Sequence, residues 1–288
     1  METISNDQIR LNQETTWKAA AVGWRKRDEI LRKGAAPVTV RMLALAQIKA
    51  GSSLLDIASG TGEPAISAAK VVGNEGYVVG SDLVDEMLNI AREKAQKENL
   101  SNIEFHRTDG ETLDITKKIT KKSFDAVTIR WGLMFMPEPE KCLNNAYHVL
   151  KNEGRIVVAC WANPERNPFI NLLLETLGRY TTLPTMPENS PGVFSFSNPA
   201  RLRGVMTSAG FKNIEIEEVA FDVMEVEDGK AYWEVISDLA TPVIRLVNQL
   251  DAEIRERFVL DVTERANELM QGDRLKMKGV TWLASANR

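Results

Sequence analysis

A short glycine-containing turn carries the residues with the clearest chemical meaning in the sequence. An apolar run at residues 54–58, typical of a buried strand, is followed directly by Gly60 and Gly62. Glycines let the backbone approach a ligand closely, and the helix that starts there directs its N–H groups at the ligand. Asp82 ends a second apolar run, where a carboxylate can accept hydrogen bonds from both hydroxyls of a ribose. The spacing therefore predicts a site for a nucleoside or nucleotide.

The same spacing also satisfies the fingerprint of dinucleotide-binding proteins, so an NAD-dependent oxidoreductase is an alternative. Two further acids favour a different ligand. Asp56 lies just before the turn and Asp109 follows a third apolar run, which places acids at three successive strand ends. Carboxylates repel phosphates but suit a zwitterionic nucleoside that carries a sulfonium. Such a nucleoside is the ligand that the sequence favours.

Apolar runs and helical stretches alternate along the elements that must position these residues. Strands are expected at 54–58, 77–81, 103–106, 124–129 and 155–160. Near-continuous apolar strands separated by helices imply a parallel sheet with both faces covered. Two later runs, at 213–226 and 279–286, add strands of antiparallel type. The predicted fold is α/β, a seven-stranded, mostly parallel, doubly wound sheet with N-terminal helices and a C-terminal helical insertion.

The chain is expected to form one domain with three regions. Residues 1–50 are predicted to be an N-terminal helical lid, 51–161 the α/β core, and 162–288 substrate-covering helices with the final strands. Helical spacing in residues 230–272 favours packing into the core, with a homodimer contact as an open alternative. In the first region Pro37 is expected to end a helix. The side chains of that helix that recur at sevens, and so share one face, are Trp17, Trp24 and Leu31.

The composition excludes several classes of protein. The chain has 288 residues, with 36 Lys and Arg against 40 Asp and Glu, and a net charge of -4. This balance argues against nucleic acid as the main ligand, because phosphate binding needs an excess of cations. The one basic run, at 117–122, is expected to be a solvated loop. With no span of roughly 20 apolar residues, no signal peptide and no metal-site spacing around Cys142 and Cys160, we expect a cytoplasmic protein without a metal or a membrane span.

Four segments together carry a resemblance to a known family. They are LLDIASGTGEP at 54–64, VVGSDL at 78–83, FDAVTIRWGLMF at 124–135 and VLKNEGRIV at 149–157. The sequence resembles the class I S-adenosylmethionine-dependent methyltransferases, and within them the ubiquinone/menaquinone-biosynthesis C-methyltransferase type. The match covers residues 40–161 well and the remainder only in general layout. The resemblance implies methyl transfer from S-adenosylmethionine, with S-adenosylhomocysteine as product, to a small, largely apolar quinol, phenol or amine.

The resemblance also implies roles for individual residues around the methionine part of the cofactor. The turn residues that would line this part are Ala58, Ser59 and Gly60, followed by Gly62. Asp56 would support the turn or the amino group. Arg130 would lie beside the methionine ammonium, through its backbone carbonyl. The family usually has glycine where this chain has Ala58, which is a mild departure.

The adenosine part would be bound by residues that follow the second and third strands. Asp82 would bind the ribose hydroxyls, and Leu83 and Met87 would lie against the adenine. Asp109 would accept a hydrogen bond from the adenine amino group, and Gly110 would offer its backbone N–H.

Methyl transfer is an in-line displacement, so the protein mainly aligns the two reactants and excludes water. The end of the fourth strand is expected to face the reactive methyl group, and a general base is needed only if the acceptor must lose a proton. The catalytic residue is left unassigned. The pocket candidates are Arg130, Trp131, Met134 and Phe135. His106 and His148 lie away from the strand ends that bind ligands, which argues against a catalytic base at either position.

Three alternatives remain beside a small-molecule methyltransferase. The first is the NAD-dependent oxidoreductase, and the second is a catalytically silent, methyltransferase-like binding module. The third is a nucleic-acid methyltransferase. The acidic balance disfavours the third, as does the absence of an Asn/Asp-Pro-Pro-aromatic signature after the fourth strand, where Arg130 and Trp131 stand.

Overall fold

The computed structural model describes residues 5–112, 123–183 and 190–288. Within them a seven-stranded sheet has the strand order β3-β2-β1-β4-β5-β7-β6. Its first five strands are parallel, and β7 lies antiparallel between β5 and β6. The predicted mostly parallel α/β sheet is therefore confirmed. The strands are β1 (Ser53–Ile57), β2 (Tyr77–Asp82), β3 (Ile103–Arg107), β4 (Phe124–Arg130), β5 (Leu150–Trp161), β6 (Lys212–Val226) and β7 (Leu275–Asn287).

Burial explains why the apolar segments form the central strands. Every residue of β1 is buried, and β4 and β5 beside it are buried along most of their length. Such strands need cover on both faces, which helices supply. Helices that pack on the sheet include α3 (Ala65–Val72), α4 (Asp85–Lys97), α6 (Pro139–Val149) and α8 (Pro199–Ser208). The carboxyl ends of the parallel strands meet at one edge, where the turns after them lie together.

The two N-terminal helices are α1 (Asn6–Lys26) and α2 (Asp28–Leu45). The prediction that Pro37 interrupts a helix is wrong, because Pro37 lies inside α2 and the break falls at Arg27. A proline inside a helix costs about 3 kcal/mol. The buried face of α2 continues on both sides of Pro37 and packs against β6, which offsets this cost. Leu31 consequently belongs to a different helix from Trp17 and Trp24.

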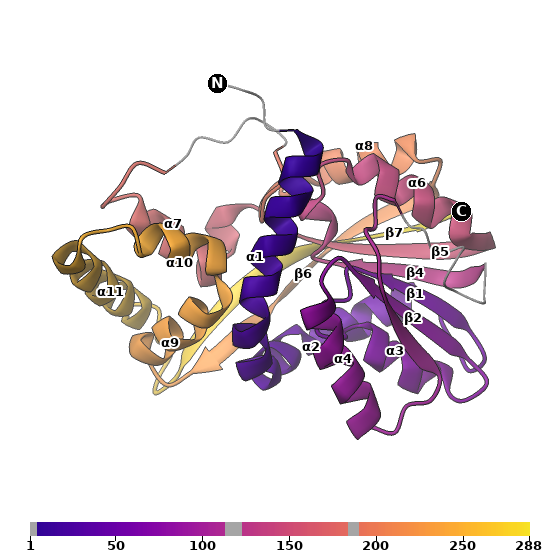
Figure 1. The fold of residues 1–288 in the computed structure, drawn as a ribbon, viewed down its shortest axis with the longest axis horizontal. Helices are drawn as coiled ribbons and strands as arrows, with labels where there is room; N and C mark the ends of the chain where they lie inside the picture. Colours follow the sequence, from indigo (N-terminus) through magenta and orange to yellow (C-terminus); the bar gives the residue numbers. More distant parts are fainter. Residues whose placement is uncertain (1–4, 113–122, 184–189) are drawn as a thin grey trace.

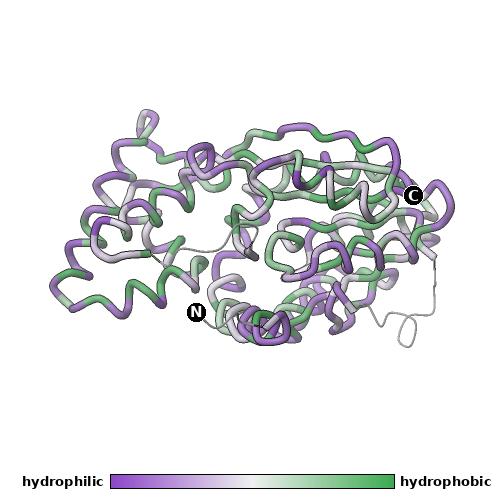
Figure 2. Tube along the Cα trace, turned by 90° about the horizontal axis from the view of Figure 1, so that it is seen from above, coloured by the Kyte–Doolittle hydropathy of each residue, from purple (hydrophilic) through white to green (hydrophobic). Residues whose placement is uncertain are grey.

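The C-terminal helical insertion lies between β6 and β7 in the sequence, as predicted. Its helices gather with α7 (Pro168–Leu177) at one end of the molecule, and α1 runs between this group and the α/β core (Figure 1). In Figure 2 the tube of this group changes repeatedly between green and purple, as expected for helices with one apolar side. The inserted helices are α9 (Gly229–Leu239), α10 (Thr241–Val247) and α11 (Ala252–Asn267). Short 3₁₀ turns occur at η1 (Leu133–Phe135) and η2 (Pro164–Arg166).

Close packing fixes the position of α1 between α4 and α9. A Cβ atom added to Gly23 would lie 1.9 Å from the backbone oxygen of Asp238 in α9, so only glycine allows this approach. On the other side, Arg25 pairs with Glu93 of α4 at 2.5 Å. The helix therefore lies directly over the sheet edge where the strand-end turns meet (Figure 1).

Two further predictions concern the basic run at 117–122 and the absence of a membrane span. The basic run at 117–122 lies outside the described residues. Across residues 5–112, 123–183 and 190–288, none of the helices is both long enough and apolar enough to span a bilayer.

Candidate active site

The glycine turn after β1 has a backbone that few side chains allow. Gly60 and Gly62 have φ of 52° and 106°, and Ala58 has φ of 57°. At Gly62 this φ strains any other residue, and an added Cβ atom would also lie 2.6 Å from Ile66 Cδ1 and 3.0 Å from the Ala91 Cβ. The turn is tied to β2, because the Ser59 N–H donates to the Ser81 carbonyl at 2.9 Å. The result is a rigid loop with its N–H groups at the sheet edge.

Asp82 at the end of β2 holds this turn and also faces a cavity. Its Oδ2 accepts a hydrogen bond from the Gly60 N–H at 2.8 Å, and its Oδ1 accepts one from the Val84 N–H at 3.0 Å. Desolvation raises the pKa of Asp82 to about 6, although these backbone N–H groups oppose the rise. The carboxylate therefore remains ionised at neutral pH, next to the turn.

A cavity of about 140 Å³ lies above this edge of the sheet, and we call it the smaller cavity. It brings together nine of the eleven predicted cofactor-binding residues and two of the other pocket candidates. These lining residues are Ala58, Ser59, Gly60, Asp82, Leu83, Met87, Asp109, Gly110, Arg130, Trp131 and Phe135. Asp56, Gly62 and Met134 are not part of its lining, and Met134 lines a second cavity instead.

Asp56 lies behind the turn and is fully buried. Its Oδ1 accepts a hydrogen bond from the Thr128 hydroxyl at 2.7 Å, which links β1 to β4. Burial raises the pKa of Asp56 to about 7, against the lowering effects of Thr128 and Arg130. This geometry favours the supporting role in the turn over contact with a ligand.

The raised pKa of Asp56 predicts a pH dependence of stability. Between the ordinary pKa of 3.8 and the raised pKa of about 7, the folded chain keeps a proton that the unfolded chain has lost. This group therefore lowers the free energy of unfolding as the pH rises through that window. Asp56→Asn removes the titration, so the stability of the variant relative to the parent should rise between pH 4 and 7, by up to about 4 kcal/mol. Urea unfolding at several pH values measures the difference, and a difference that does not change with pH would contradict the assignment.

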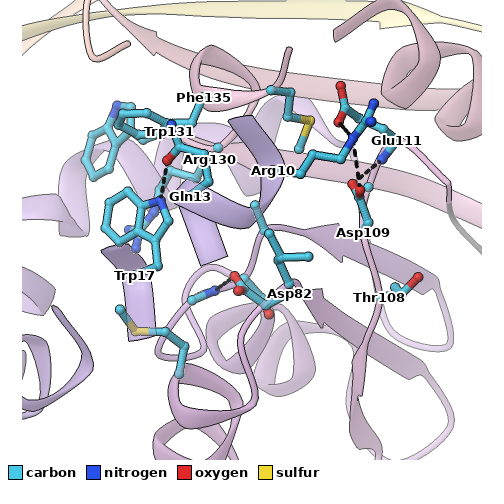
Figure 3. A pocket seen from close by; sticks show the side chains of 18 of the residues that line it. Arg10, Gln13, Trp17, Asp82, Thr108, Asp109, Glu111, Arg130, Trp131 and Phe135 are labelled. Carbon is cyan, nitrogen blue, oxygen red and sulfur yellow. Dashed lines mark hydrogen bonds and ion pairs between the residues drawn. The ribbon is translucent and has the colours of Figure 1, made fainter. Parts of the chain in front are cut away.

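Arg10 of α1 is a site residue that the sequence analysis missed. Its guanidinium lies 2.6 Å from Glu111 Oε2 and 3.4 Å from Asp109 Oδ2, and it also pairs with Glu138. Burial opposes the charge, but the hydrogen bonds to Glu111 and Glu138 raise the pKa of Arg10 above its usual range. In Figure 3 Arg10 reaches toward Asp109 and Glu111, on the opposite side of the cavity from Trp17 and Trp131. The pairing holds the start of α1 on the loop after β3.

A second, larger cavity of about 400 Å³ adjoins the smaller one. Its walls come from α1, α2, α7, β6, α9 and α10, and they are almost entirely apolar. The two cavities share the side chains Gln13, Trp17, Trp24, Trp131 and Phe135, which we call the junction. All four aromatic residues of the junction are candidates for a lid or pocket from the sequence, whereas Gln13 was not predicted.

Trp131 in the junction is held in one orientation by its neighbours. Its backbone φ is 56°, an unusual value for a bulky residue. Its indole N–H donates to Thr281 Oγ1 at 3.1 Å, and its ring stacks on that of Trp161 with 4.4 Å between centroids. The next residue must be glycine, since a Cβ on Gly132 would lie 2.3 Å from the Ala58 Cβ. These contacts fix an aromatic wall between the two cavities.

His106 and His148 lie in β3 and α6, and neither belongs to the lining of the two cavities. Among the residues that the structure describes, no three His, Cys, Asp or Glu side chains are grouped as a metal site would require.

The strand order, the antiparallel seventh strand and the acid-lined cavity over the β1 turn define a class I methyltransferase that uses S-adenosylmethionine. Residues 39–187, more than half of the chain, match the model of the ubiE/COQ5 methyltransferase family. The chain belongs to this family. Its cofactor is therefore S-adenosylmethionine, and not the NAD that the glycine turn also allowed.

Three comparisons illustrate the relationship. The ubiquinone/menaquinone biosynthesis C-methyltransferase of Marinomonas sp. (strain MWYL1) is 28% identical over 196 residues, 63% of this chain and 75% of the relative. The demethylmenaquinone methyltransferase of Lactobacillus johnsonii is 31% identical over 184 residues, which is 60% of this chain and 73% of the relative. The crystal structure of the YcgJ protein from Bacillus subtilis covers 87% of this chain and 97% of its own, with a TM-score of 0.54 and 18% identity. The last likeness shows the fold alone.

Proposed function

We propose that the smaller cavity binds S-adenosylmethionine and the larger cavity binds a small, largely apolar, uncharged methyl acceptor. The observation that carries this proposal is the junction, where an acid-lined cavity meets an apolar one across a shared set of aromatic side chains. A cofactor and an acceptor in the two cavities would meet at the junction. The family of the chain supports the same division of roles.

The residues after β3, β2 and β1, which are neighbours in the sheet, fit the adenine, ribose and methionine parts of the cofactor in turn. Asp109 and Gly110, after β3, are proposed to bind the adenine, with Leu83 and Met87 against its ring. Asp82, after β2, is proposed to accept hydrogen bonds from the ribose hydroxyls. The turn after β1 is then left for the methionine part and would be lined by Ala58, Ser59 and Gly60.

The chemistry of the larger cavity supports an uncharged acceptor. None of its lining residues in the described chain is Asp, Glu, His, Lys or Arg. A charged acceptor would lose its hydration there without compensation, at a cost of several kcal/mol. Polar side chains come from α1 only and are Asn12, Gln13 and Thr16. The Trp24 indole N–H is also buried without a partner among the described residues, so it can donate to an oxygen of the acceptor.

A quinol or phenol fits this surface better than a charged amine. Its ring would lie against the apolar walls, and its oxygen would face α1. Two relatives of the chain are named for ubiquinone or menaquinone biosynthesis and for demethylmenaquinone methylation, so a quinol is the first acceptor to test.

Alignment is the main contribution of the chain to the reaction. S-adenosylmethionine, when bound, supplies a methyl group activated by its sulfonium. The rings of the junction would surround that charge and add cation–π attraction. Trp131, held by Thr281 and Trp161, would keep the acceptor in line with the methyl group. Residues 1–50 would act as a lid that excludes water, residues 51–161 would bind the cofactor, and residues 162–288 would cover the acceptor.

A charge placed in the larger cavity should abolish methyl transfer without affecting the cofactor. Leu174 of α7 lines only this cavity, so Leu174→Lys buries an ammonium where the acceptor would lie. We expect kcat/KM for a quinol or phenol acceptor to fall by at least about 100-fold, because an unpaired charge is costly to bury. Transfer of a tritiated methyl group to the extracted acceptor measures the rate.

The matched control is Leu260→Lys, at a leucine of α11 that is 59% exposed and lies outside the cavity. This variant should keep the parent rate, and both variants should bind S-adenosylhomocysteine as the parent does. Unchanged methyl transfer by Leu174→Lys would show that the acceptor does not occupy the larger cavity.

A further inference from the structure

Arg130, at the end of β4, is a desolvated cation without a counter-ion in contact. Its side chain lines the smaller cavity and donates one hydrogen bond, at 2.7 Å, to the Thr39 hydroxyl. The guanidinium also lies 5.0 Å from the centre of the Trp131 ring. Within the described part of the chain, no carboxylate oxygen lies within 4.0 Å of it. A guanidinium has five N–H donors, so most of its donors are free to bind a ligand.

The guanidinium of Arg130 has lost hydration, and no counter-ion among the described residues is in contact with it to compensate for that loss. Desolvation lowers its pKa, while the more distant Glu63, Asp56 and Asp28 act in the opposite direction. Removing a cation from water is costly unless hydrogen bonds and a counter-ion compensate. An anion that enters the smaller cavity would supply both.

Glu63 provides an opposite charge in the same cavity. It follows Gly62 directly, lines the cavity, and accepts a hydrogen bond from the Ser67 N–H through Oε2 at 3.3 Å. It is near enough to act on Arg130 electrostatically but forms no ion pair with it. The two charges are therefore separate and can each take one group of a zwitterion.

The strand order places Arg130 and Glu63 at the end of the smaller cavity away from Asp109, where the methionine part of the cofactor is proposed to lie. Asp109 and Arg130 follow β3 and β4, which are three strand spacings apart in the order β3-β2-β1-β4. At about 4.8 Å a spacing this is about 14 Å, enough to separate a nucleobase from an amino acid group. Asp56, the other acid of the turn after β1, does not line the cavity, so Glu63 is the carboxylate that this turn itself contributes to the lining.

We propose that the Arg130 guanidinium binds the carboxylate of the methionine part of S-adenosylmethionine and that Glu63 binds its ammonium. This inference rests on the proposed function of the smaller cavity. It replaces the expected role of Arg130, through its backbone carbonyl, with a role for its side chain. It also adds Glu63 to the site. The only sign of this role in the sequence was the position of Glu63 directly after Gly62.

Three ligands that carry two, one or none of the charged groups can test the proposal by isothermal titration. They are S-adenosylhomocysteine, its decarboxylated analogue S-adenosyl-3-thiopropylamine, and 5′-methylthioadenosine, which lacks both charged groups. Arg130→Met should weaken S-adenosylhomocysteine by about 10- to 100-fold, the usual range for charge-assisted hydrogen bonds. The same variant should bind the other two ligands as tightly as the parent or more tightly, because the unpaired cation is gone. Glu63→Gln should weaken the first two ligands and leave 5′-methylthioadenosine unchanged.

Arg10→Met is the matched control, because Arg10 lines the same cavity at the Asp109 end. It should affect all three ligands by the same factor. Binding of 5′-methylthioadenosine also reports whether Arg130→Met has folded. Equal weakening of S-adenosylhomocysteine and its decarboxylated analogue by Arg130→Met, or no weakening of either, would overturn the inference alone. Failure of the parent chain to bind S-adenosylhomocysteine would overturn the proposed function itself.

Discussion

Asp82→Ala should weaken the binding of S-adenosylhomocysteine by more than about 100-fold. In the proposed site this carboxylate accepts hydrogen bonds from two ribose hydroxyls, each worth about 1.5–3 kcal/mol when the acceptor is charged. The substitution also removes the hydrogen bond that the Gly60 N–H donates to Asp82 Oδ2 at 2.8 Å, which holds the glycine turn in place. Both losses act on the same ligand. Isothermal titration of S-adenosylhomocysteine into the purified chain measures the effect.

Asp85→Ala is the control for charge and position. Asp85 opens α4 three residues further along, is partly exposed, and does not line the cavity. We expect it to bind like the parent chain. Because the pKa of Asp82 is about 6, binding by the parent should also strengthen as the pH rises through 6 and the carboxyl ionises. An Asp82→Ala chain that binds normally would remove Asp82 from the site.

Gly23→Ala should lower the free energy of unfolding by about 1–3 kcal/mol, the range of overpacking in a closely packed interface. The added Cβ would lie 1.9 Å from a backbone oxygen of α9, so α1 or α9 must move by about 1 Å. That movement opens the interface that holds α1 over both cavities. Urea unfolding followed by circular dichroism measures the stability, and weaker binding of S-adenosylhomocysteine should accompany the loss.

Gly204→Ala is the matched control, because Gly204 also lies inside a helix and has no atom within 4 Å of an added Cβ. It should stabilise the chain by about 0.5–1 kcal/mol, through the higher helix propensity of alanine. Equal effects of the two substitutions would show that the contact between α1 and α9 is not tight.

The parallel core could be predicted because its signals are local. Near-continuous apolar strands alternate with helices there, and the glycines and acids follow the strands within a few residues. Family resemblance added the roles of Leu83 and Met87, which have no chemical signature of their own. The seventh strand was predicted from its β-branched and aromatic content, and its partners β5 and β6 came only with the structure.

The contribution of α1 could not be predicted in the same way. Arg10 meets Glu111, which is 101 residues away, and nothing near Arg10 in the sequence indicates that contact. Pro37 misled the prediction because its usual effect on a helix is offset by packing against β6, a strand far along the chain. The larger cavity is built in the same manner, from elements that only the folded chain brings together. Long-range packing is therefore the part of the site that local patterns do not contain.

The aromatic junction also has an optical consequence. Of the six tryptophans in the chain, Trp17 and Trp24 lie on α1 with 5.6 Å between ring centroids, and Trp131 stacks on Trp161 of the sheet at 4.4 Å. Indoles this close share their electronic excitation, so their emission and near-ultraviolet dichroism depend on their mutual orientation. One pair belongs to α1 and the other to the sheet. Trp17 also packs edge-on against Phe135 with 5.2 Å between ring centroids, and both α1 tryptophans line the junction with Trp131. A displacement of α1 changes these surroundings and the separation of the two pairs, so the intrinsic fluorescence is an unlabelled reporter of the opening of the cavities.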